Sequence, residues 1–286
     1  MSGDDWLFDG SGTPDEVQAD LQRRLTGYRH DVRRRPTAVA GAAASTLLLG
    51  LVAVVALGTR GPVPWSLETA TCSGCVWEVG SSLDTTQRAV AQVANRGELV
   101  ASSGAVVRRL DGDGARLAVD AGRIDVWVDA EAEWLTVQLP GVELVDLGCA
   151  FSVDVDPQGH GVVQVATGAV GLRGSGPETV LPAGTMAATW PSGHTGLAVV
   201  HQADASFVAR VDAFDRGGDW RPVLDAAELG DAITVWHLLD RVPDRASVVE
   251  RLVELLGAGA VDRSGLVADD ADAERDTLAF IIGRTL

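Results

Sequence analysis

Hydrophobic and polar residues alternate along the middle of the chain, from about Ser103 to Trp190. Successive side chains of a β-strand point to opposite faces of a sheet, so a period of two predicts strands with one buried face. The alternation is plainest at Phe151, Val153 and Val155, which are separated by single polar residues. Short turns rich in Gly, Pro and Asp divide the runs. The pattern predicts a mainly β domain, folded as an antiparallel two-layer sandwich or a twisted β-solenoid.

The end of the chain has a different period, because apolar residues recur there every three or four positions. This spacing is typical of amphipathic helices. Asp204, Asp231 and Asp244 each precede such a run and are the expected N-caps of three helices. A fourth helix is expected from about Asp270 to Ile282. We therefore predict a small α-helical region over 201–286, whose apolar stripes pack on each other or on the sheet.

One apolar run contains no charged residue, from Ala38 to Gly58. A helix rises about 1.5 Å per residue, so this run just crosses a hydrocarbon core of about 30 Å. The alternatives are a buried core helix, which rarely lacks a polar face over this length, and a cleaved signal peptide. A signal peptide would need an n-region of about 36 residues, which is far longer than usual. We expect one transmembrane helix.

The arginines give this helix an orientation. Six Arg precede it, and only Arg60 follows it closely. The positive-inside rule then places the N-terminus in the cytoplasm and the bulk of the chain outside. The expected organisation is a cytoplasmic tail over 1–36, a transmembrane helix over 37–58, an extracytoplasmic linker with a CxxC motif over 59–94, the β domain over 95–200 and the helical region over 201–286.

The cytoplasmic tail carries an apolar stripe at helical spacing. Thr13 is a candidate N-cap and Pro14 the first helical residue. The stripe consists of Val17, Leu21, Leu25, Tyr28 and Val32. An isolated helix of about 20 residues is marginal in water, so the stripe is a candidate face for a cytoplasmic partner, a second copy or the membrane surface. The alternative is that the tail is only a positively charged anchor.

Charge narrows the possible partners. The chain has 286 residues and a formal net charge of −17, and all 23 basic residues are Arg. Residues 61–286 contain 16 Arg and 33 acidic residues, so 16 − 33 = −17 lies in that part. Nucleic-acid binding needs a cationic surface to displace counterions. We therefore expect no direct contact with nucleic acid.

A weak internal repeat lies within the β region. Residues 117–126 align with 163–172 at an offset of 46, which matches Gly122 with Gly168 and Val119 with Val165. Each copy follows a turn containing Gly or Asp. The match predicts two similar hairpins in a sandwich or solenoid.

Several spaced motifs over residues 95–190 resemble the FecR domain. The segment Val145–Val153 resembles the family's "LGTxFxV" strand, and Val163–Val170 and Leu181–Gly184 resemble the strand and turn that follow it. The residues that carry the resemblance are Leu147, Gly148, Phe151, Val153 and Gly168. Such proteins are single-pass regulators of the bacterial inner membrane. The resemblance implies a cytoplasmic part that controls an extracytoplasmic-function sigma factor and a periplasmic part that receives a signal from an envelope protein.

Two departures from the family stand out. Cys149 occupies a position where the family has Thr, and the tail lacks the His-xxx-Cys-xx-Cys zinc signature of many anti-sigma domains. Further on, Ile233–Arg241 resembles an "LTLWHLL.R" element that follows the FecR domain in some members. No function accompanies that element, and we expect Trp236 and His237 to be packed residues.

Few residues suggest chemistry. Cys72 and Cys75 form a CxxC motif that outside the cytoplasm favours a local disulfide; free thiols, a redox pair and a metal site are the alternatives. A zinc site would need two more ligands, and no second CxxC or HxxxH exists. Asp111–Gly114 is a turn rather than a calcium loop, since it lacks the closing Glu. His160 and His194 have no partner visible in the sequence.

The patterns together favour a membrane-anchored signal-relay protein of anti-sigma type, which is not an enzyme and needs no cofactor or metal. Its expected partners are the membrane, a cytoplasmic sigma factor and an envelope signalling protein. The alternative is an envelope scaffold or binding module tethered by one transmembrane helix. An envelope hydrolase is disfavoured because no GxSxG nucleophile elbow occurs.

Overall fold

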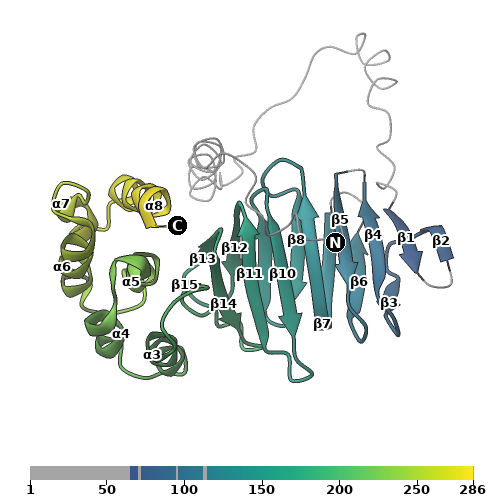
Figure 1. The fold of residues 1–286 in the computed structure, drawn as a ribbon, viewed down its shortest axis with the longest axis horizontal. Helices are drawn as coiled ribbons and strands as arrows, with labels where there is room; N and C mark the ends of the chain where they lie inside the picture. Colours follow the sequence, from purple (N-terminus) through teal and green to yellow (C-terminus); the bar gives the residue numbers. More distant parts are fainter. Residues whose placement is uncertain (1–64, 70–71, 95, 112–114, 286) are drawn as a thin grey trace, which may run out of the picture.

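The computed structural model describes residues 65–69, 72–94, 96–111 and 115–285 (Figure 1). The predicted cytoplasmic tail and its apolar stripe, and the predicted transmembrane helix over 37–58, lie outside these residues. Within the described part, no helix combines the length and the apolar composition that a membrane crossing requires.

The first part of the described chain consists of strands. They are β1 (Trp65–Thr69), β2 (Cys72–Val76), β3 (Ser82–Asp84), β4 (Ala89–Val93), β5 (Gly97–Ala101), β6 (Val106–Asp111), β7 (Ala115–Val128), β8 (Leu135–Leu139), β9 (Val142–Asp146), β10 (Ala150–Val155), β11 (Gly161–Thr167), β12 (Ala169–Arg173), β13 (Thr179–Pro182), β14 (Thr185–Thr189) and β15 (Val199–Val200). The strands begin at Trp65, so β1 to β4 lie within the predicted linker over 59–94. That segment contains its own alternating run, Ala89–Val93, in which every second side chain is buried.

Two sheets share this β body, and we name them sheet A and sheet B. Sheet A has the order β2-β1-β4-β5-β7-β10-β11-β14-β15, and sheet B has the order β3-β6-β7-β8-β9-β12-β13. The described pairs are antiparallel except β7 with β8, which is parallel. The predicted antiparallel β fold followed by helices is therefore confirmed. Buried side chains of both sheets form one continuous core.

Strand β7 belongs to both sheets and changes from one to the other at Gly122. Its first half pairs with β6 and β8, and its second half pairs with β5 and β10. Gly122 adopts a φ of +81°, and a Cβ there would lie 2.5 Å from the Cα of Ala105. Only glycine combines a left-handed φ with so close a backbone approach.

Gly168, which the predicted repeat matches with Gly122, also lies at a change of sheet. It separates β11 in sheet A from β12 in sheet B, with a φ of +73°. Gly148, with a φ of +88°, makes the change between β9 and β10. The repeat in the sequence thus reflects a repeated change of sheet rather than two similar hairpins.

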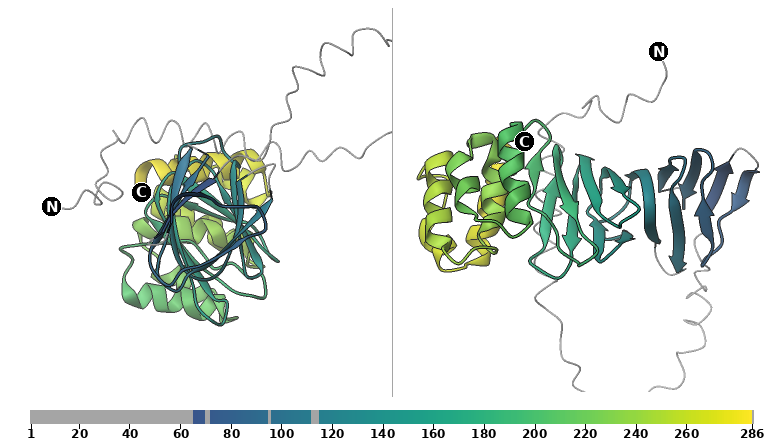
Figure 2. Two further views of the ribbon diagram at one scale, coloured as in Figure 1. Left: turned by 90° about the vertical axis from the view of Figure 1, so that its right-hand side faces the viewer. Right: turned by 90° about the horizontal axis from the view of Figure 1, so that it is seen from below.

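Helices close one end of the β body (Figure 2). They are α3 (Ala205–Asp215), α4 (Arg221–Ala226), the 3₁₀ helix η2 (Leu229–Asp231), α5 (Ala232–Leu238), α6 (Arg245–Leu256), α7 (Arg263–Val267) and α8 (Ala271–Thr285). Asp204 caps α3 and Asp244 caps α6 as predicted, through the N–H groups of Ser206 and Ser247. Asp231 differs, because its carboxylate accepts the N–H of Glu228 instead of capping α5.

The polar side chains of helix α5 form hydrogen bonds that join the helices to the β body. Thr234 donates to the carbonyl of Ala198, at 2.6 Å. His237 accepts the N–H of Val180 at its Nε2 and donates from Nδ1 to the carbonyl of Ile233. These bonds fix the neutral imidazole in one tautomer. The packed position expected for Trp236 and His237 is confirmed, since each is 4% exposed.

Candidate partner-binding groove

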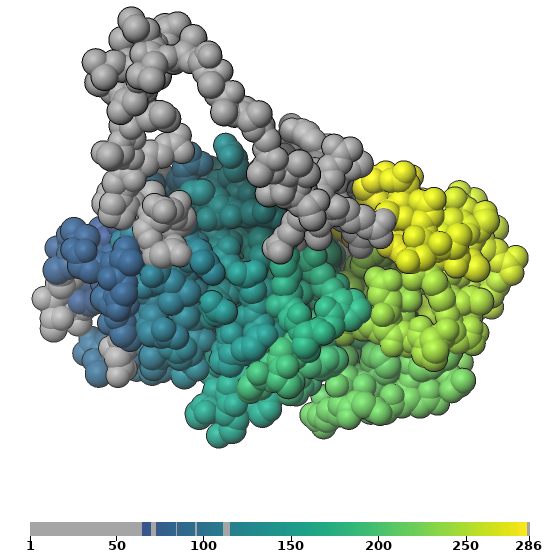
Figure 3. All heavy atoms as spheres, turned by 180° about the vertical axis from the view of Figure 1, so that it is seen from behind, coloured from purple at the N-terminus to yellow at the C-terminus, as the bar shows by residue number. Residues whose placement is uncertain are grey.

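A groove of about 620 Å³ lies on the outer face of sheet A, where helix α3 approaches the strands. The strand layers and helices form one continuous surface in the space-filling view (Figure 3). The groove is lined by Arg123, Ser152, Asp154, Asp156, His160, Gly161, Val162, Gln164, Ala188, Thr189, Trp190, Asp212 and Arg216. Its volume falls in the range of sites that hold small molecules or parts of a polypeptide.

The floor of the groove is a row of side chains across four neighbouring strands. Asp154 of β10 is paired in register with Arg123 of β7 and with Val162 of β11, which is paired with Ala188 of β14. These residues alternate with the buried core positions, so the pleat directs them outward. Val162 is 40% exposed and places an apolar spot on the polar floor.

The β10–β11 turn forms one rim. Asp156 accepts the N–H groups of Gln158 and His160 at 2.8 Å, and its other oxygen lies 3.1 Å from Nδ1 of His160. Burial opposes ionisation of Asp156, but these hydrogen bonds outweigh it and lower the pKa of the carboxyl. His160 therefore has a local partner that the sequence did not reveal.

Helix α3 and the turn after β14 form the opposite wall. Arg216 and Asp212, one helical turn apart, make an ion pair at 2.9 Å. Trp190 packs against His194 with the ring centroids 4.9 Å apart. Burial lowers the pKa of His194, and the Arg241 guanidinium lowers it further, so the imidazole favours its neutral form.

The charges in the groove are mostly compensated. Arg123 contacts Asp125 at 2.8 Å, which leaves Asp154 as a carboxylate without an ion pair among the described groove residues. The surface combines a surplus of negative charge, hydrogen-bonding groups and the apolar Val162 and Trp190. Such a mixed surface suits an extended segment of a protein partner better than an apolar ligand.

The residues that carry the FecR resemblance lie elsewhere and are structural. Leu147, Phe151 and Val153 are at most 3% exposed. Cys149 is buried, and its thiol donates to Oδ1 of Asp146 at 2.6 Å; the N–H of Gly148 donates to the same oxygen at 3.0 Å. A Thr hydroxyl could make the bond that Cys149 makes, which explains how this departure is tolerated.

The CxxC motif lies in strand β2, at the edge of sheet A. Gly74 between the cysteines has a φ of +71°, and the register with β1 shifts between Leu67 and Glu68. Cys75 is disulfide-bonded, whereas Cys149 is not. The side chain of Cys72 lies outside the described part, so the Cys72–Cys75 pairing stays a prediction.

Thiol labelling tests that pairing. We expect a maleimide to modify neither Cys72 nor Cys75 of the native, unreduced protein, because a closed disulfide offers no thiolate. Cys149 should react only after denaturation, since it is 3% exposed. Mass spectrometry of the labelled peptides gives the result, and a reduced sample is the positive control. Ready labelling of Cys72 or Cys75 in native membranes would contradict the pairing.

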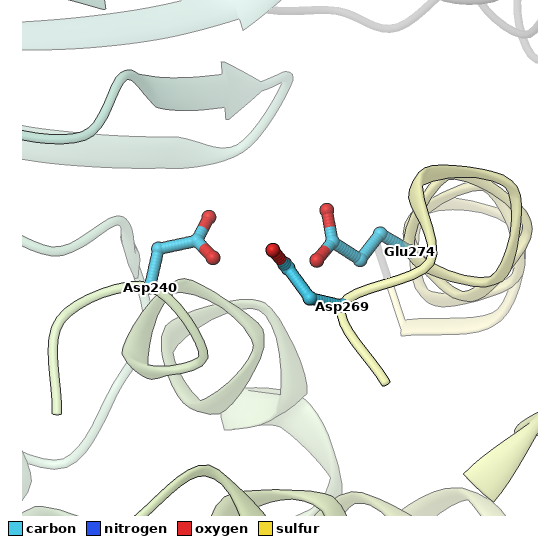
Figure 4. A group of neighbouring side chains, drawn as sticks. All are labelled: Asp240, Asp269 and Glu274. Atoms are coloured by element: carbon cyan, nitrogen blue, oxygen red, sulfur yellow. The ribbon is translucent and has the colours of Figure 1, made fainter. Parts of the chain in front are cut away.

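Three carboxylates, those of Asp240, Asp269 and Glu274, converge at the helical end (Figure 4). Their cation is Arg245, which contacts Asp240 at 3.1 Å, Asp269 at 3.4 Å and Glu274 more closely. The same guanidinium donates to the carbonyls of Leu239 and Leu266. The cluster therefore joins the end of α5 to α6, α7 and α8, and Arg245 occupies the place that a metal ion would take.

Sequence reasoning missed the groove, although part of its signal was present. Arg123, Asp154 and Val162 belong to alternating runs whose buried positions were recognised, so their outward direction could have been inferred. Their proximity to α3 could not, because it depends on how the helices dock. The predicted partner face Val17, Leu21, Leu25, Tyr28 and Val32 lies outside the described residues.

Neither a family model nor a curated protein matches the sequence. Two crystal structures of a provisionally assigned anti-sigma factor from Parabacteroides distasonis, at 1.65 and 2.50 Å resolution, resemble this chain. The identities are 16% and 17% and the TM-scores 0.37 and 0.36, over 46% of this chain and 63% of that one. This chain thus covers less than two thirds of the neighbour's length.

Proposed function

We propose that the chain is a membrane-anchored signal-relay protein of anti-sigma type. In this proposal, residues 1–36 bind a sigma factor in the cytoplasm through the apolar stripe of the tail. The apolar run over 37–58 crosses the bacterial inner membrane once, and the body from Trp65 onward lies outside, where it meets an envelope signalling protein.

The observation that carries the proposal is the distribution of arginine around the uncharged run. Six Arg precede the run and Arg60 alone closely follows it. With this asymmetry, the positive-inside rule separates a short tail from a large acidic body on opposite sides of a membrane. The motifs that resemble the FecR domain support the same organisation, and the groove beside α3 offers a surface for the outer partner.

A second function has its own support. Residues of the described body line the groove on sheet A. A tethered envelope scaffold would use this groove to hold a partner, with the apolar run serving only as an anchor. The two functions differ in the tail, which is dispensable in the scaffold and necessary in the relay.

Reporter fusions test the topology on which the relay depends. We expect a periplasm-active reporter fused after Leu286 to be active, and the same reporter fused near Gly10 to be inactive. A cytoplasm-active reporter at the same two sites should give the opposite pattern and serves as the control. If the periplasmic reporter is active at Gly10 and inactive after Leu286, the relay proposal fails.

A further inference from the structure

Asp215 is the last residue of helix α3, and its carboxylate is packed into the β body. It accepts the N–H of Leu197 with both oxygens, at 3.2 and 3.3 Å. A Cβ on Gly196 would lie 2.7 Å from Oδ2, so the carboxylate rests directly on the backbone of the 190–197 segment. We name Asp215, Gly196 and Leu197 the α3 seat.

Charged and titratable groups surround the α3 seat on several elements. Asp212 lies one turn earlier on α3, and His194 lies in the segment before Leu197. Arg241, from the turn after α5, is close enough to favour an ionised Asp215, and Asp240 acts in turn on Arg241. The hydrogen bonds of Arg241 nevertheless go to Thr179 and Thr195, not to Asp215.

The α3 seat offers few hydrogen-bond donors to an ionised carboxylate. One backbone N–H faces the two oxygens, and the hydrogen bonds of the Arg241 guanidinium go to Thr179 and Thr195. The carboxyl also lies at the C-terminal end of α3, where the helix dipole disfavours negative charge. Desolvation raises the pKa of Asp215 to about 7, against the opposing effects of Leu197 and Arg241.

We propose that Asp215 makes the joint between helix α3 and the β body a proton-responsive hinge. The protonated carboxyl holds the C-terminal end of α3 in its seat, and ionisation loosens that end. Asp212 of α3 and Arg216, the residue directly after the helix, both line the groove and flank Asp215 in the sequence. Loss of the proton thus loosens one wall of the groove while leaving its floor on the sheet unchanged.

Proton linkage determines whether the α3 seat becomes more or less stable as the pH rises. An unfolded Asp titrates near pH 4, so between about pH 4 and pH 7 the seated carboxyl holds a proton that the released one has lost. Stability of the seat therefore falls as the pH rises through this window and is constant above it. His194 has a lowered pKa and loses its proton before Asp215 does.

Hydrogen exchange of the full chain in detergent micelles measures how strongly the C-terminal end of α3 is held in the α3 seat. After correction for intrinsic exchange, we expect protection of the last turn of α3 to fall about ten-fold between pH 6 and pH 8. Asp215→Asn keeps a neutral acceptor in the seat and should abolish this dependence. Asp219→Asn, at an exposed position after α3, is the matched control and should behave as the wild type.

A direct titration keeps the proposal testable if Asp215→Asn does not fold. The ¹³C NMR shift of the Asp215 side-chain carboxyl should move with a midpoint near pH 7. A midpoint near pH 4, or the same pH dependence of α3 protection in wild type and Asp215→Asn, would overturn the hinge. Neither result bears on membrane topology, because the hinge depends on the geometry of the joint alone.

Discussion

Replacing Gly168 with alanine is expected to destabilise the β body severely. The new methyl group would meet the carbonyl of Gly148 and lie 2.8 Å from the Cβ of Cys149, in a backbone with φ near +73°. Backbone strain and the steric clash together cost roughly 3–5 kcal/mol, a large part of the stability of an ordinary domain. The near-UV circular dichroism melt of the full chain in detergent should shift down by on the order of 10 °C.

Variants of two other glycines separate the destabilisation caused by backbone strain from that caused by the steric clash. Gly104 also has a positive φ, of +84°, but nothing lies within 4 Å of an added Cβ, so Gly104→Ala measures backbone strain alone. Gly176 has neither feature, and Gly176→Ala should be nearly neutral. If Gly168→Ala is no more destabilising than Gly104→Ala, the close approach at the change of sheet is not what requires glycine.

The second large effect is expected in the tail, and it rests on the proposed relay. Burying a Leu side chain is worth roughly 1.5–3 kcal/mol. Leu21→Asp together with Leu25→Asp removes two such contacts and puts charges where an apolar groove is expected. We expect the double variant to lose co-purification of its cytoplasmic partner and to change transcription of that partner's target genes.

A matched control adds the same charge to another face of the predicted helix. Gln18 and Gln22 are also four residues apart and lie outside the apolar stripe. Gln18→Asp with Gln22→Asp should therefore retain the partner. Membrane insertion should be normal in both variants, since Arg33 to Arg35 and the apolar run are unchanged. If the Leu variant keeps every cytoplasmic partner and transcript level, the tethered scaffold is the better account.

Local patterns along the chain were sufficient for the elements themselves. Alternation around Phe151 and Val153 predicted β10, and Asp204 and Asp244 predicted the starts of α3 and α6. These signals act within a few residues, because a pleat or a helix cap is a property of consecutive backbone units. The short helices α4 and α7 were missed, since five or six residues give too little periodicity to detect.

The change of sheet was visible in the sequence but could not be interpreted there. Gly122 and Gly168 aligned in the repeat, yet a glycine in a strand pattern is equally consistent with a bulge, a turn or a weak strand. The contacts that require glycine are made with Ala105 and Gly148, which lie in other connections between strands. The strands within 59–94 were likewise overlooked, because their short runs depend for their stability on pairing with each other and with β5 and β6.

The sequence by itself determined which segments are strands and helices, where the charge lies and which uncharged run is long enough to cross a membrane. Only the tertiary structure decided the chemistry of single side chains. Asp215 and Leu197 are 18 residues apart, and His237 and Val180 are 57 apart. Such partners meet through the packing of whole elements, and the burial that raises the pKa of Asp215 or fixes the tautomer of His237 exists only once that packing has formed.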